Sequence, residues 1–104
     1  MALKLVSNYD ESLNSWTVAL QGEVDISSKK QLKDELIQLN TEKQLDFIFN
    51  CENLEYIDST GLGVLISFYK EVKINDKTVH FEKLKPSIIK LFTLTGLNKI
   101  FSIR

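Results

Sequence analysis

The spacing of apolar residues changes several times along the chain, and each change marks a new element. Residues 3–9 and 16–21 both have strand character, and the segment ESLN between them is polar like a turn. Two strands joined by a short polar turn predict a β-hairpin at the amino end.

The first helical pattern follows the segment GEVD at positions 22–25. Leucines at positions 32, 36 and 39 recur at helical spacing and predict an amphipathic helix that ends near Asn40, with Ser27 or Ser28 as its N-cap. This helix also carries charged side chains, which we expect to form a solvated face first and a partner surface second. They are Lys29, Lys30, Lys33, Asp34 and Glu35.

The sequence predicts two more helices. The segment from Ser59 to about Lys73 is apolar on most sides, which predicts a helix buried against both a sheet and a neighbouring helix. A third helix can begin at Pro86, and we expect it to end at Gly96, because glycine commonly follows the last turn of a helix.

Short apolar or alternating segments separate the helices. Residues 45–51 are too few for a helix and are typical of a central strand, whereas residues 78–84 alternate and place His80 on the exposed face. Residues 99–103 add a last strand. A hairpin followed by alternating strands and helices predicts one α/β domain over residues 1–104, with a mixed, mostly parallel sheet and right-handed crossovers.

Composition excludes several classes of function. The 13 basic and 14 acidic residues give a formal net charge of −1, so neither nucleic acid nor a membrane surface is an expected partner. No segment has the ~18 apolar residues of a membrane span or the form of a signal peptide, which predicts a cytoplasmic protein. One cysteine, Cys51, and one histidine, His80, cannot form a zinc shell, and we expect neither metal nor cofactor.

The segment EYIDSTGLG at positions 55–63 joins a short strand-like piece to the second helix. Ser59 or Thr60 can cap this helix, while Gly61 and Gly63 remove side chains from its first turn at up to ~1 kcal/mol each relative to alanine. A capped and tightly packed helix start accounts for a serine but not for two glycines. We therefore expect a surface that is kept bare, at the end of the sheet where ligands and partners usually bind.

Three chemical interpretations compete for this turn. A serine hydrolase requires a glycine two residues before Ser59, where the chain has Ile57. A phosphate-binding loop requires a third glycine or a lysine, and Ile66 stands at the glycine position. The third interpretation makes Ser59 the substrate of a kinase. Phosphorylation adds about −1.5 to −2 charges, and the N-terminus of a helix tolerates a negative charge.

Three blocks of sequence resemble the STAS-domain anti-sigma factor antagonists, the bacterial anti-anti-sigma factors. They are GEVD at 22–25, YIDSTGLGVLISFYKEV at 56–72 and KPSIIKLFTLTGLNKIF at 85–101, in the family's order and spacing. The resemblance implies a protein that is not an enzyme. Its unphosphorylated form would bind an ATP-dependent anti-sigma factor serine kinase of the GHKL type and free the sigma factor. Phosphorylation would end this binding, and a PP2C-type phosphatase would restore it.

The resemblance also implies roles for single residues. Ser59 matches the phosphoacceptor, and Asp25 matches the acid of a loop beside it. The implied partner-binding residues are Asp25, Asp58, Ser59, Thr60, Gly61, Leu62, Gly63 and Leu91.

Alternatives remain for several of these assignments. Asp25 is equally well explained as an N-cap or turn residue, and core burial is the first interpretation of Leu62 and Leu91. For the whole chain, the alternatives are a STAS-fold regulatory subunit of a transport or other signalling assembly, with no serine phosphorylation, and a small hydrolase that uses Ser59.

Overall fold

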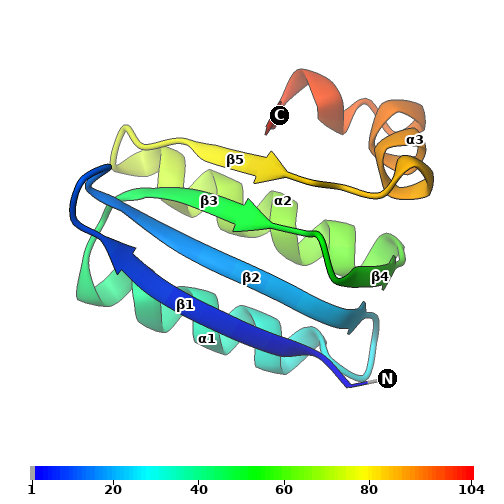
Figure 1. The fold of residues 1–104 in the computed structure, drawn as a ribbon, viewed down its shortest axis with the longest axis horizontal. Coiled ribbons are helices and arrows are strands. Elements are labelled where there is room, and N and C mark those ends of the chain that lie inside the picture. The colour runs from blue at the N-terminus through cyan, green and yellow to red at the C-terminus, as the bar shows by residue number, and fades with distance from the viewer. Residues whose placement is uncertain (1) are drawn as a thin grey trace.

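A computed structural model describes residues 2–104 and shows a six-stranded mixed sheet with helices packed against it (Figure 1). Strands β1 (Lys4–Asp10) and β2 (Ser15–Val24) form the predicted antiparallel hairpin, with Leu5 opposite Leu20 and Tyr9 opposite Trp16. The remaining strand pairs are parallel, so the predicted α/β class and mostly parallel sheet are confirmed.

The sheet order is β1-β2-β3-β5-β6, with β4 paired to β2. Strand β2 is long enough to hold two partners in succession: β3 (Asp46–Asn50) pairs with its first half and β4 (Leu54–Ile57) with its last residues. Strands β5 (Val79–Glu82) and β6 (Ser102–Ile103) complete the far side.

Helices α1 (Lys29–Glu42) and α2 (Ser59–Ile74) lie side by side against one face of the sheet (Figure 1). Helix α3 (Pro86–Leu94) and the 3-10 turn η1 (Leu97–Lys99) follow β5. None of the helices in the described part of the chain is both long enough and apolar enough to span a membrane.

Phenylalanine rings connect the sheet to the helices. The Phe47 ring on β3 meets the Phe68 ring of α2 edge-on at 4.7 Å between centroids. The Phe81 ring on β5 lies 5.1 Å from Phe49 and 5.3 Å from Phe92 of α3. Aromatic contacts of this kind add to the burial of apolar area, and here they hold α2 and α3 in place.

Two elements differ from the sequence prediction. Strand β4 is a separate strand that the predicted element order omits; it pairs with the end of β2, which runs beyond the last residue that pairs with β3, Ala19. Gly22 has φ +99°, and an added Cβ would lie 2.1 Å from the Ala2 carbonyl oxygen, so only glycine fits there.

The carboxyl-terminal segment is the second difference. The predicted strand at 99–103 is shortened to β6, because η1 takes up the residues before it. The backbone N–H groups of Ile100 and Phe101 both donate to the Leu97 carbonyl, at 3.0 and 2.8 Å, instead of joining the sheet. Helix α1 runs two residues beyond its predicted end, to Glu42.

Candidate functional site

The start of α2 is fixed by Asp58, the residue before the first helical turn. Its Oδ1 accepts a hydrogen bond from the Gly61 backbone N–H at 3.0 Å, and its own N–H donates to the Val24 carbonyl at 3.2 Å. Asp58 is therefore the N-cap, and the prediction that Ser59 or Thr60 caps the helix is wrong. The capping carboxylate leaves the serine hydroxyl free for other chemistry.

Ser59 is the first residue of α2 and is exposed. Among residues 2–104, its hydroxyl has no hydrogen-bond partner, whereas Thr60 behind it is half-buried. An enzyme that modifies a serine needs a hydroxyl that is exposed and not hydrogen-bonded, and the Ser59 hydroxyl meets both conditions.

The two glycines of the motif have different surroundings. A Cβ on Gly61 would lie 2.5 Å from Val24 Cγ1 and 2.8 Å from Ile57 Cγ1, so Gly61 lets α2 approach the ends of β2 and β4. A Cβ on Gly63 would meet nothing within 4 Å. Packing within the chain thus explains Gly61 but not Gly63, which lies exposed one turn after Ser59.

The loop after β2 is held by Asp25. Its Oδ1 accepts hydrogen bonds from the Ser27 hydroxyl at 2.6 Å and from the Ser27 and Ser28 backbone N–H groups at 2.9 and 3.2 Å. These bonds, the Ser27 hydroxyl first, lower the pKa of the Asp25 carboxyl. With these hydrogen bonds Asp25 stabilises a turn, which is one of the roles that the sequence suggested for it.

Ser28 occupies the N-cap position of α1, as one of the two predicted candidates, but its side chain makes no capping bond to the helix. Its hydroxyl donates instead to the Glu23 carbonyl at 3.0 Å. The loop is therefore tied internally at several points and keeps a fixed shape.

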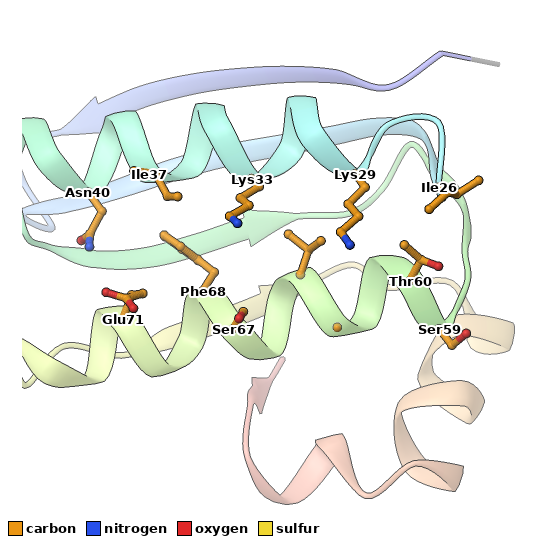
Figure 2. Close-up of a pocket in the computed structure, with 12 residues that line it drawn as sticks. Ile26, Lys29, Lys33, Ile37, Asn40, Ser59, Thr60, Ser67, Phe68 and Glu71 are labelled. Carbon is orange, nitrogen blue, oxygen red and sulfur yellow. The ribbon is translucent and has the colours of Figure 1, made fainter.

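The two loops leave neighbouring strands at the same edge of the sheet. Val24 of β2 pairs with Ile57 of β4, so the residues that follow each strand start side by side. Ile26 of the first loop, and Ser59 and Thr60 at the start of α2, line one hollow (Figure 2). The structure thus brings together the two motifs that the sequence places 33 positions apart, at Asp25 and Asp58.

Leu62 and Leu91 differ in burial. Leu62 is 5% exposed and belongs to the core, as first expected, whereas Leu91 of α3 is half-buried at the edge of the core. Only Leu91 keeps a substantial surface that a partner can touch.

The hollow continues as a groove of about 800 Å³ between α1 and α2 (Figure 2). Its lining comprises Ile26, Lys29, Lys33, Ile37, Asn40, Ser59, Thr60, Gly63, Val64, Ser67, Phe68 and Glu71. The charged residues of α1 were expected as a solvated face first and a partner surface second, but the sequence did not separate Lys29 and Lys33, which line the groove, from the others. The signal was the spacing of positions 29, 33, 37 and 40, which lie on a single face of α1.

The one histidine of the chain does not line the hollow that contains Ser59. His80 lines a second, separate hollow with Lys73 and Ile100, and its Nε2 lies 2.8 Å from the Thr78 hydroxyl. The fully buried Cys51 thiol has its pKa raised by burial to about 12. Within residues 2–104, no three His, Cys, Asp or Glu side chains gather as a metal site would require.

Comparison with known proteins assigns the family. The model of the STAS domain matches residues 8–104. The chain belongs to the STAS domain family. The resemblance found in the sequence is therefore confirmed over nearly the whole chain.

Several curated and solved relatives of this STAS domain are named as antagonists of anti-sigma factors. The anti-sigma-B factor antagonist of Bacillus subtilis (strain 168) is 36% identical over 90 residues, which are 86% of this chain and 82% of the relative. Its name describes a regulatory antagonist and not an enzyme.

Two solved structures share the fold. The crystal structure of an anti-sigma factor antagonist from Mycobacterium paratuberculosis has a TM-score of 0.81 at 19% identity and matches 98% of this chain and 85% of that one. The Bacillus cell fate determinant SpoIIAA in its phosphorylated form has a TM-score of 0.70 at 20% identity, over 99% of this chain and 91% of that one.

Proposed function

We propose that this protein is an anti-sigma factor antagonist that is switched by phosphorylation of Ser59. The unphosphorylated form binds an anti-sigma factor, itself a serine kinase of the GHKL type, and so frees a sigma factor in the cytoplasm. The observation that carries the proposal is the exposed Ser59 hydroxyl, unbonded within residues 2–104 and placed on the first turn of α2.

The docking surface consists of the Asp25 loop, the start of α2 and Leu91. Gly63 supports this assignment, because a glycine inside a helix lowers its stability by roughly 0.5–1 kcal/mol and no contact within residues 2–104 requires it. A partner that approaches closely at Gly63 gives a reason for the missing side chain.

The same place accepts a phosphate without loss of the fold. The positive end of a helix dipole favours an anion by about 0.3–1 kcal/mol, and Ser59 is the first residue of α2. Binding of the partner, by contrast, is weakened, because a phosphate beside Asp58 adds negative charge to a surface that binds the partner with a neutral hydroxyl. A PP2C-type phosphatase would reverse the modification.

Mass spectrometry after incubation with ATP and the anti-sigma factor kinase of the same organism tests this function. Wild type should gain one phosphoryl group at Ser59, and Ser59→Ala should gain none while its circular dichroism spectrum stays unchanged. Phosphate on Thr60 would contradict the residue assignment. Tight binding of the kinase with no phosphate transfer would favour a regulatory subunit that docks through the same serine.

A further inference from the structure

The groove between α1 and α2 extends well beyond the turn that contains Ser59. Both helices start at the same end of the groove, where Lys29 lies across from Thr60, and they run together to Asn40 and Glu71 (Figure 2). From Lys29 to Asn40 the helix rises by eleven steps of about 1.5 Å, which gives the groove a length of about 17 Å. That length matches about three turns of a partner helix.

The groove has the opposite charge balance to the whole chain. Its lining includes two lysines, Lys29 and Lys33, and one carboxylate, Glu71, whereas the chain has a formal net charge of −1. Neither lysine has an ion-pair partner in the part of the chain that the structure describes. Lys30 on the same helix, by contrast, pairs with Asp34 at 2.6 Å and does not line the groove.

Apolar side chains lie along the same groove. Ile26 at one end is 72% exposed and Ile37 further along α1 is 45% exposed, while Val64 and Phe68 of α2 are buried beneath. Gly63 leaves open space above α2 in the first half of the groove. Exposed isoleucines beside unpaired lysines describe a surface for an amphipathic and acidic segment.

We infer that this groove receives an amphipathic helix of the anti-sigma factor, whose acidic residues face Lys29 and Lys33 and whose apolar residues cover Ile26 and Ile37. The inference rests on the proposed function and deepens it, because the groove continues the docking surface from Ser59 for three turns along α1 and α2. Lys29 and Lys33 are one helical turn apart, so carboxylates at positions i and i+4 of the partner helix face both of them.

Binding of the anti-sigma factor kinase by calorimetry, with two matched double variants, tests the charge of the groove. Lys29→Glu with Lys33→Glu should weaken binding by about tenfold or more and reduce its salt dependence, because two attractive pairs become repulsive. The control is Lys30→Glu with Lys70→Glu, two exposed lysines outside the groove, which changes net charge equally. This control should bind within about twofold of wild type.

A photo-crosslinking amino acid at position 37 identifies the occupant. It should capture an acidic, amphipathic segment of the kinase, and the same amino acid in place of the exposed Ile74 should capture none. Equal affinity of the two double variants, or capture of a basic segment at position 37, would overturn the inference. Failure of wild type itself to bind would instead overturn the proposed function, so the two failures are distinct.

Discussion

At the scale of single residues, neighbouring positions of the motif DSTGLG have different structural roles. Asp58 caps the helix, Ser59 is left free, Gly61 lets the helix approach the sheet, and Gly63 has no role within the described chain. The sequence alone predicts Ser59 as the candidate phosphoacceptor and a surface kept bare around it. It could not assign the cap or separate the two glycines, because both depend on where Val24 and Ile57 lie in three dimensions.

Substitution of each glycine by alanine separates packing from partner contact. Gly61→Ala should destabilise the fold by about 1–3 kcal/mol, because its Cβ would lie 2.5 Å from Val24 Cγ1. Gly63→Ala should stabilise the helix by about 0.5–1 kcal/mol and yet weaken binding of the kinase. Urea denaturation and calorimetry measure the two effects, and a Gly63→Ala protein that binds like wild type would show that the partner does not approach there.

At the scale of elements, α2 depends on one side chain for its start. Asp58→Ala should lower the free energy of unfolding by about 0.5–2 kcal/mol, because the Gly61 N–H loses its acceptor. Ser59→Ala and Thr60→Ala are the controls and should change stability far less, since neither hydroxyl caps the helix. Thermal melts of the three variants decide this, and an equal loss in Ser59→Ala would contradict the assignment of the cap.

The elements also show what a sequence pattern can and cannot reveal. The sequence predicts α2 because a long segment is apolar on most sides, and it predicts the hairpin because a short polar turn joins two strand-like segments. Strand β4 has only four residues, and it pairs with the end of β2 because β2 runs beyond the residues that β3 covers. The turn η1 forms from bonds to the Leu97 carbonyl that no periodicity indicates.

At the scale of the whole molecule, the sheet carries a titratable group that couples folding to pH. Burial first, and the charge of Arg104 second, hold the pKa of His80 below its usual value of 6.5. The native state therefore binds fewer protons than the unfolded chain, so this contribution to stability is complete above that value and is lost as the pH falls below it. The melting temperature of wild type should fall from about pH 7.5 to about pH 5.5, while carboxylates stay ionised.

His80→Gln removes the titrating group and keeps a side chain that can bond to the Thr78 hydroxyl. Its melting temperature should change less than that of wild type over the same pH range. An identical slope in both proteins would show that another group is responsible.

The proposed switch concerns the whole molecule, because it requires that the fold survive phosphorylation of Ser59 while binding is lost. Ser59 lies outside the core, and none of the described hydrogen bonds of the Asp25 loop or the helix cap involves its side chain. Phosphate at this position should therefore change the melting temperature little and the affinity for the kinase greatly.

The most direct test is the affinity of the anti-sigma factor kinase for this protein with and without phosphate on Ser59, measured by titration calorimetry on samples of equal melting temperature. The phosphorylated protein should bind on the order of a hundredfold more weakly, because a second negative group must be desolvated beside Asp58. Equal affinity of the two forms would contradict the claim that Ser59 is the switch.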